Sequence, residues 1–229
     1  MTNEILWLIM LASNFLWILV AYRLFGKIGL YAWISIAVII ANLQVFKIVK
    51  LFGMTASLGN IVYATSFLAT DILAENHGKR AAGKAVGMGF IALTTLTLFM
   101  NLAILFEPST IDSANDSMKS LFQLLPRIAL ASFAAYGISQ VHDVWLFSIL
   151  KRRHPGAKWL WIRNNLSTMV SQLIDSLIFC SIAFLGLVPM VEFWEITFTT
   201  YILKWLVAVA DTPMIYLARH WYSQGKISN

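Results

Sequence analysis

Long apolar stretches separated by short polar ones make up most of the chain. The apolar runs cover approximately residues 5–22, 28–46, 51–70, 85–106, 121–150, 161–188 and 194–217. A helix needs about 20 apolar residues to cross the hydrocarbon core of a bilayer, so each run is long enough to span it. Alternating segments of about ten residues, which indicate a membrane barrel, are absent from the sequence. The pattern predicts an all-α integral membrane protein, a bundle of six to seven transmembrane helices.

The first run has to be distinguished from a signal peptide. Glu4 precedes it, whereas a signal peptide begins with basic residues, and no small-residue cleavage site follows it. We therefore interpret residues 5–22 as a helix. We expect residues 1–229 to form a single polytopic transmembrane domain.

The charges between the runs alternate in sign along the chain. Basic residues gather at Arg23 and Lys27, at Lys79 to Lys84, at Lys151 to Lys158, and at Arg219 and Lys226. Acidic residues gather in the loops between them, at Glu107, Asp112, Asp116, Glu192 and Glu195. Because basic loops face the cytoplasm, seven spans would place the N-terminus outside and the C-terminus inside. Lys47 and Lys50 are exceptions, which either reach the lipid headgroups or indicate that the second helix ends earlier.

Composition agrees with a membrane protein and removes several other classes. The 229 residues are 59% hydrophobic and 12% charged, with a mean hydropathy of +0.73, which no soluble domain of this length approaches. The net charge of +6 reflects the basic loops rather than a nucleic-acid partner. Cys180 is the single cysteine, so neither an internal disulfide nor a cysteine-based metal cluster is expected. Without a Gly-x-x-x-x-Gly-Lys-Ser/Thr loop, the chain itself is not expected to hydrolyse ATP.

One polar pattern occurs twice within otherwise apolar sequence. Its two copies are Ser139-Gln140-x-x-Asp143-x-x-x-Phe147 and, 32 residues later, Ser171-Gln172-x-x-Asp175-x-x-x-Phe179. In each copy the glutamine and the aspartate are three residues apart and share a helix face. Polar groups at mid-span are costly and indicate function by default. Because consecutive spans run in opposite directions, the copies form a local inverted pair, like the inverted repeats of transporters.

Polar residues at helical spacing follow the last three predicted helices. They are Ser132, Tyr136, Gln140 and Asp143, then Asn164, Thr168, Ser171 and Asp175, and finally Thr197, Tyr201, Lys204 and Asp211. A stripe with a period near 3.6 must face protein or water rather than lipid. Hydrogen bonds between helices explain the hydroxyl groups, whereas Asp143, Asp175 and Lys204 favour a binding site. A purely structural Asp–Lys pair stays an open alternative.

The same residues indicate the kind of molecule that would bind. Carboxylate oxygens only accept hydrogen bonds, while asparagine and glutamine amides both donate and accept, so a small polar solute with several N–H groups fits. Aromatic residues near these positions would sandwich a flat ring, namely Tyr63, Phe67, Tyr136, Phe147, Phe179 and Tyr201. The residue types predict a polar, planar small molecule held between helices near the midplane.

Several short motifs, in order and at compatible spacings, carry a resemblance to a known family. They are Asn42, Phe67-Leu68-Ala69-Thr70-Asp71 with Glu75 and Gly78-Lys79, Arg127-Ile128-Ala129 leading to Gln140-x-x-Asp143, Asn164 to Thr168, Asp175-Ser176-x-x-Phe179, and Tyr201-x-x-Lys204. Over about residues 40–210 the chain resembles the queuosine precursor transporters, also called the vitamin uptake transporter family. Because the first span, residues 5–22, lies outside this range, the resemblance implies that it is peripheral to the core. This resemblance implies a bacterial inner-membrane transporter, not an enzyme, that imports 7-cyano-7-deazaguanine and 7-aminomethyl-7-deazaguanine.

The resemblance also implies a set of substrate-binding residues. They are Asn42, Gln140, Asp143, Asn164, Gln172, Asp175, Tyr201 and Lys204. One aspartate, Asp143 or Asp175, would accept the ring N–H and the exocyclic amine of a guanine-like edge. The other would accept the pyrrole N–H or pair with Lys204.

Further expectations concern gating and partners. Asp71, Glu75 and Arg127 are expected to act in gating or coupling. No catalytic residue, metal or cofactor is expected. The expected partners are the lipid bilayer and the 7-deazapurine substrate, without nucleic acid, and a homo-oligomer stays open.

Functions of other classes stay as alternatives. The nearest is a substrate-binding membrane subunit of a vitamin-type uptake system powered by a partner ATPase, which would have the same kind of pocket. An intramembrane aspartyl protease also needs two aspartates on adjacent helices, but neither Asp143 nor Asp175 follows a Gly-x-Gly sequence. A retinal protein would carry a lysine in its last helix, but Thr200, one turn before Lys204, stands where a counter-ion carboxylate is needed.

Overall fold

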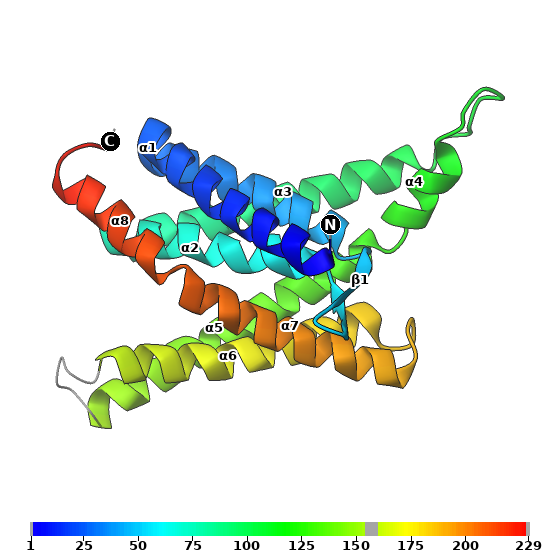
Figure 1. The fold of residues 1–229 in the computed structure, drawn as a ribbon. Helices are drawn as coiled ribbons and strands as arrows, with labels where there is room; N and C mark the ends of the chain where they lie inside the picture. The colour runs from blue at the N-terminus through cyan, green and yellow to red at the C-terminus, as the bar shows by residue number, and fades with distance from the viewer. Residues whose placement is uncertain (1, 154–159, 228–229) are drawn as a thin grey trace.

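Helices make up most of the fold (Figure 1). The computed structural model describes residues 2–153 and 160–227, except for the side chains at 140–141, 143–144, 147–148, 151, 160–165 and 167–168. The elements in chain order are α1 (Asn3–Gln44), β1 (Ile48–Leu51), β2 (Met54–Ser57), α2 (Gly59–His77), α3 (Lys79–Ala103), α4 (Asn115–Phe122), α5 (Leu125–Arg153), α6 (Leu160–Phe184), α7 (Met190–Ala210) and α8 (Thr212–Ser223). The predicted all-α class is confirmed, with one small hairpin in addition.

Helix α1 consists of two arms that fold back on each other. A straight helix of 42 residues would be about 63 Å long, roughly twice the thickness of the hydrocarbon core. The helical path breaks at Gly26, which has φ 56° and ψ −138°, and a Cβ on Gly29 would clash with the carbonyl oxygen of Ala21. The side chain of Asn3 donates to the carbonyl of Lys50 at 2.8 Å, so the chain has returned to its starting end. The two arms correspond to the first two predicted apolar runs.

The first arm of α1 belongs to the largest buried core among the described residues. Phe15, Ile18 and Tyr22 share this core with Leu68 of α2. The Tyr22 hydroxyl also accepts a hydrogen bond from Asn76 Nδ2 at 2.9 Å. Both apolar burial and a polar contact therefore join the first arm to α2.

The segment between α1 and α2 forms a β-hairpin, where the sequence predicted the start of a third apolar span. Strand β1 pairs antiparallel with β2, and Leu51 lies opposite Met54. The turn residues Phe52 and Gly53 have φ of 51° and 78°, as a two-residue type I′ turn requires. Helix α2 therefore begins only at Gly59. The sequence pattern missed this break because the predicted run contains no charge that would mark it.

Polar contacts fasten the hairpin to distant parts of the chain. Lys50 Nζ lies 3.3 Å from the carboxylate of Glu195 in α7, and the amide of Thr55 donates to the same carboxylate at 3.0 Å. The amide of Phe52 donates to the Glu4 carboxylate at 3.1 Å. Lys50, an exception to the predicted alternation of charge, thus has an acidic partner at its own end of the bundle.

The last predicted span is divided in two. Helix α7 ends at Ala210 and α8 begins at Thr212, with Pro213 in its first turn. Proline lacks an amide hydrogen and its ring clashes with the preceding turn, so a new helix begins there instead of the old one continuing. The eight-residue helix α4 begins in the polar segment between the fourth and fifth predicted spans and ends at Phe122, just inside the fifth apolar run.

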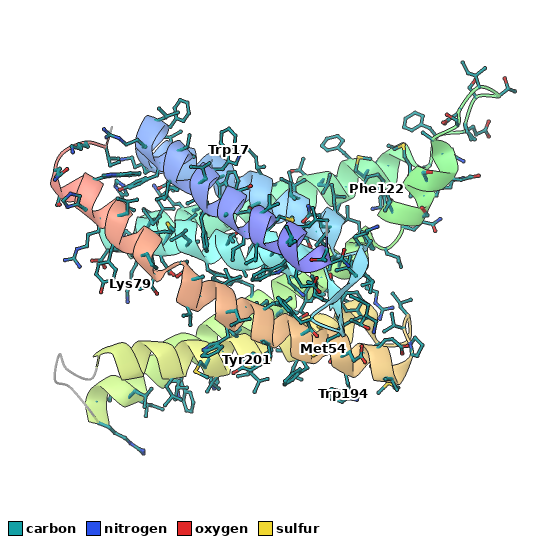
Figure 2. All side chains as sticks on the ribbon, in the orientation of Figure 1. Trp17, Met54, Lys79, Phe122, Trp194 and Tyr201 are labelled. Carbon is teal, nitrogen blue, oxygen red and sulfur yellow. The ribbon has the colours of Figure 1, made fainter. Side chains whose placement is uncertain are left out.

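The helices expose apolar side chains as well as burying them. Helix α5 packs along α6, α1 packs on α2 and α3, and α7 contacts α2 and α6 (Figure 1). Trp17 and Trp194 are 58% and 56% exposed on the outside of the bundle (Figure 2). Within the described ranges, four helical stretches are long and apolar enough to cross a membrane: Asn3–Gln44, Lys79–Ala103, Asn115–Ser139 and Met190–Ser223. The chain is a multi-pass membrane protein, and the number of its spans stays a prediction.

The two ends of the bundle collect different parts of the chain. The N-terminus, the hairpin and the start of α7 lie at one end, as the contacts of the hairpin with Glu4 and Glu195 show. The turn of α1 and helix α8 lie at the other end, where the Arg23 guanidinium is 5.8 Å from the centre of the Trp221 ring. Figure 1 shows the two termini well separated.

Candidate functional site

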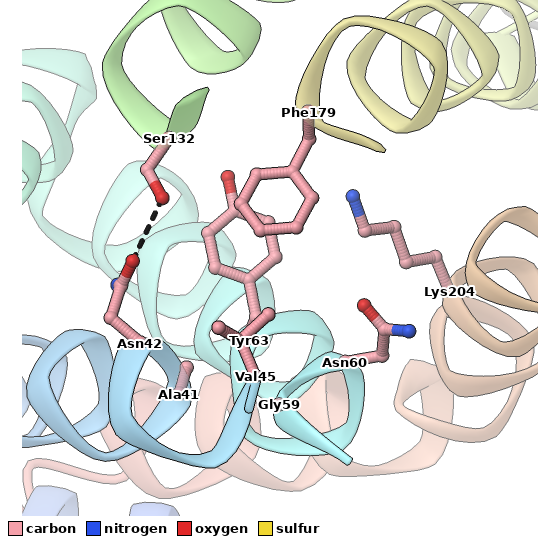
Figure 3. A pocket seen from close by; sticks show the side chains of 9 residues that line it. All are labelled: Ala41, Asn42, Val45, Gly59, Asn60, Tyr63, Ser132, Phe179 and Lys204. Carbon is pink, nitrogen blue, oxygen red and sulfur yellow. Dashed lines mark hydrogen bonds between the residues drawn. The ribbon is translucent and has the colours of Figure 1, made fainter. Parts of the chain in front are cut away.

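A pocket lies where five helices meet: the second arm of α1, the start of α2, and α5, α6 and α7. The pocket is small and partly open, with about 20 Å³ of volume for the centre of a water-sized molecule. Its lining residues, drawn in Figure 3, are Ala41, Asn42, Val45, Gly59, Asn60, Tyr63, Ser132, Phe179 and Lys204. A lysine, two amides, a hydroxyl and two aromatic rings therefore surround one small space.

A buried ion pair forms the wall of the pocket on α6 and α7. Lys204 Nζ pairs with Asp175 Oδ2, and the two residues are only 4% and 3% exposed. Asp175 Oδ1 accepts a hydrogen bond from Ser139 of α5 at 3.3 Å. The Lys204 ammonium also lies 4.9 Å from the centre of the Tyr63 ring, within the range of a cation–π interaction. A charge taken out of water is stable only when such partners surround it.

The part of the lining on α1 and α2 presents neutral amides. Asn42 accepts a hydrogen bond from Ser132 Oγ at 2.9 Å and donates to the Val38 carbonyl at 2.7 Å. Asn60 donates from Nδ2 to Thr200 Oγ1 of α7 at 2.8 Å. These contacts join α1 to α5 and α2 to α7 across the pocket, and they hold both amides in fixed orientations.

Aromatic rings complete the lining. Tyr63 and Phe179 come from α2 and α6, and both line the pocket (Figure 3). The Tyr63 ring is braced edge-on by Phe67, 5.4 Å between centres. Flat, braced aromatic faces beside hydrogen-bonding groups suit a planar polar ligand.

The structure brings several predicted binding residues to this pocket. Asn42 and Lys204 line it, and Asp175 binds the Lys204 ammonium. Gln172 is one turn from Asp175, and its Oε1 is buried without a hydrogen-bond partner in the described part of the chain. Tyr201 is one turn from Lys204, half-buried, and not among the lining residues.

Three other predicted binding residues, Gln140, Asp143 and Asn164, have side chains outside the described residues. Their roles stay predictions. The two copies of the polar pattern nevertheless meet, because Ser139 of the first copy donates to Asp175 of the second.

The residues predicted to gate or couple transport are not among those that line the pocket. Glu75 forms an exposed ion pair with α8, with 3.1 Å between the charged atoms, and Asp71 is exposed one turn before it. Arg127 donates from Nε and Nη2 to the carbonyl oxygens of Ile182 and Leu185, each at 2.5 Å. It thereby satisfies carbonyl groups at the end of α6 that a helix leaves unpaired. A part in gating stays a prediction for all three.

The predicted set of binding residues did not include Asn60 or Ser132, although the sequence left the Asn60 amide open between a binding role and a bond to another helix. Asn60 begins a helix without a polar stripe of the kind that marks the last three helices, so no periodicity singles it out. Ser132 does belong to a predicted stripe, where a hydroxyl is explained by hydrogen bonding between helices, and its bond to Asn42 is of that kind. Only their shared position on the pocket wall distinguishes them.

The fold and the pocket define a class of protein. A multi-pass helical bundle with a buried charged pair and amides around a pocket between its helices is typical of a membrane transporter for a small polar molecule. Comparison with known proteins then gives the family.

The family model described as "Putative vitamin uptake transporter" matches residues 57–218. The "Probable queuosine precursor transporter" of Bacillus subtilis (strain 168) is 43% identical over 219 residues, which cover 96% of each chain. The "Queuosine precursor transporter" of Escherichia coli (strain K12) is 27% identical over 164 residues, 70% of this chain and 71% of the relative. No solved structure matches the chain. The chain belongs to the queuosine precursor transporter family, also called the vitamin uptake transporters, and it is a transporter rather than an enzyme.

Proposed function

We propose that this protein imports 7-cyano-7-deazaguanine and 7-aminomethyl-7-deazaguanine across the bacterial inner membrane, and that the pocket between α1, α2, α5, α6 and α7 binds them. The observation that supports this best is the Lys204–Asp175 ion pair, buried at the pocket wall. A charged pair at this depth is costly, and a ligand site explains its presence. The names of the relatives supply the class of ligand.

The chemistry of a deazaguanine complements the lining. Lys204 has three N–H groups, of which one meets Asp175, so another is free to donate to the ring carbonyl oxygen of the ligand. Tyr63 and Phe179 offer flat apolar surfaces to the faces of the ring. Asn42 has both amide groups bound within the protein, so it forms a rigid part of the wall rather than an adaptable one.

We propose Asp143 as the second carboxylate of the site. Helices α5 and α6 are antiparallel neighbours, in which Ser139 meets Asp175. Asp143 lies four residues further along α5, about 6 Å or one turn beyond Ser139, on the side of the ion pair away from Ser132. Because Asp175 is already paired with Lys204, Asp143 is the carboxylate left to accept the exocyclic amine or the pyrrole N–H of the ligand.

The distribution of charge supports an orientation with the N-terminus outside and the C-terminus in the cytoplasm. The end of the bundle that contains the turn of α1 and helix α8 carries Arg23, Lys27 and Arg219. Basic residues of this kind face the cytoplasm. Asp71 and Glu75 lie toward this end of α2, and we propose that they act in opening or coupling on the cytoplasmic side, with Arg127 holding α5 against α6.

Uptake by the purified protein tests the proposal. Proteoliposomes that contain only this protein are expected to accumulate radiolabelled 7-cyano-7-deazaguanine, and unlabelled 7-aminomethyl-7-deazaguanine should compete while adenine should not. In detergent, a ligand at one hundred times its Kd should stabilise the folded state by about 2.7 kcal/mol, seen as a raised unfolding temperature. Binding without uptake would indicate a substrate-binding subunit that needs a partner ATPase. Folded protein that binds neither deazaguanine would contradict the proposal.

A further inference from the structure

We infer that Asn60 is a specificity-determining residue of the pocket: held by Thr200, it presents a fixed hydrogen-bond acceptor beside the Lys204 donor. Together these groups select a ligand edge in which a ring N–H stands next to a carbonyl. The inference rests on the proposed function and adds to it a residue and a chemical criterion for the substrate.

The position of Asn60 is fixed by a close approach of two helices. Gly59 opens α2 directly against the end of α1, where a Cβ on Gly59 would clash with the Ala41 carbonyl oxygen and lie 3.0 Å from the Val45 nitrogen. Any larger residue would push α2 away from α1. The absence of a side chain at Gly59 therefore sets the depth of Asn60 in the pocket wall.

The orientation of Asn60 is fixed by one hydrogen bond to α7. Its Nδ2 donates to Thr200 Oγ1 at 2.8 Å, and the two residues are 4% and 1% exposed. The amide oxygen then turns into the pocket on the side of Lys204 (Figure 3). No described side chain donates to this oxygen, whereas in Asn42 both the oxygen and the nitrogen are bound within the protein. Asn60 is thus the amide of the pair that has an acceptor left for a ligand.

The two neighbouring groups have opposite hydrogen-bonding roles. The Lys204 ammonium only donates, and the Asn60 oxygen only accepts. A lactam edge, with its carbonyl toward Lys204 and its ring N–H toward Asn60, satisfies both. An edge with an amino group and an unprotonated ring nitrogen places donor against donor and acceptor against acceptor. A buried polar group left unpaired in this way weakens binding strongly, so the pair of residues discriminates between the two edges.

A simpler role for the Asn60–Thr200 bond is to hold α2 against α7 without any contact to a ligand. The two roles differ in one measurable quantity, the ratio of the affinities for two ligands that differ only at this edge. A loss of packing lowers both affinities together and leaves their ratio unchanged. A loss of the fixed acceptor changes the ratio.

Isothermal titration calorimetry on the full-length protein in detergent measures this ratio. The ligands are 7-cyano-7-deazaguanine and its 6-amino analogue, in which the neighbouring ring nitrogen has lost its hydrogen. We expect the unaltered protein to prefer the lactam by at least about tenfold. Asn60→Leu should abolish the preference, and Thr200→Val should reduce it because the amide is then free to rotate. Thr200→Ser, which keeps the hydroxyl, should retain it.

Thr199→Val is the matched control. Thr199 is as buried as Thr200, but its hydroxyl donates to the Glu195 carbonyl of its own helix at 2.6 Å and does not line the pocket. This variant should keep the preference of the unaltered protein. A preference that survives both Asn60→Leu and Thr200→Val, or equal binding of both ligands by the unaltered protein, overturns this inference alone. Folded protein that binds neither ligand overturns the proposed function and this inference with it.

Discussion

The two walls of the pocket are held together in different ways. On the side of α1 and α2, Asn42 and Asn60 are each fixed by neutral hydrogen bonds of 2.7 to 2.9 Å, of a kind that contributes about 1 kcal/mol each. On the side of α6 and α7, Lys204 and Asp175 are fixed by each other, and removing one partner from such a buried pair costs about 3–5 kcal/mol.

This difference assigns two requirements of a binding site inside a membrane, folding and choice of ligand, to different walls of the pocket. The charged wall is strongly coupled to folding, because neither charge is tolerated alone at that depth. The amide wall is weakly coupled to folding, so its residues are free to change the choice of ligand with little effect on stability. We therefore expect damage to the charged wall to be a loss of the folded site, and damage to the amide wall to be a change of specificity.

The largest effect is expected when the ion pair is broken from one side. Lys204→Met leaves the Asp175 carboxylate buried without its counter-ion, so the free energy of unfolding should fall by about 3–5 kcal/mol and uptake should be lost. The double variant Asp175→Asn with Lys204→Met removes both charges and should recover most of the stability without recovering uptake. Thermal unfolding in detergent and uptake in proteoliposomes measure the two quantities. A single variant as stable as the unaltered protein would show that the pair is not coupled to folding.

An intermediate effect is expected at the contact that positions the amide wall. Gly59→Ala places a Cβ against the Ala41 carbonyl, so α2 must shift and stability should fall by about 1–3 kcal/mol, with weaker binding of the deazaguanine. Gly83→Ala is the control, because a Cβ there meets no atom within 4 Å and alanine favours the helix. It should be neutral or slightly stabilising. If both substitutions changed the unfolding temperature and the ligand affinity equally, the close approach of α1 and α2 at Gly59 would have no specific effect on stability or binding.

The smallest effect on stability is expected far from both walls, at the exposed Glu75–Arg219 pair. With side chains 46% and 64% exposed, this pair should contribute less than about 1 kcal/mol. Glu75→Gln should nevertheless reduce the rate of uptake without changing ligand affinity, because we propose that the carboxylate acts in gating. Arg219→Gln breaks the same ion pair but keeps the carboxylate, so its uptake rate should stay near normal. Equal rates in the two variants would assign Glu75 no role beyond the ion pair.

The contributions of sequence and structure can be separated residue by residue. The apolar runs alone predict the helices and the membrane, because a helix in lipid satisfies its own backbone and its hydrophobicity is a local property. The pattern also marks Asp175 and Lys204 as candidates for the site, since ionisable residues are rare in such runs. The pattern does not show that the first arm of α1 packs into the core. It also does not show that residues 48–57 form a hairpin or that Pro213 divides the last helix, because each break lies in an apolar run and is only a few residues long.

Tertiary structure decides which polar groups meet. Asp143 and Asp175 occupy equivalent positions in the repeated pattern. The packing of α6 on α7 decides that Lys204 forms its ion pair with Asp175. Asn60 and Thr200 are 140 residues apart in the chain, so no local signal connects them. The sequence by itself determined that this protein is a helical membrane protein with polar groups inside it, because hydrophobicity acts on each segment separately. The pocket, its ion pair and its fixed acceptor depend on contacts between segments, and these exist only once the bundle is folded.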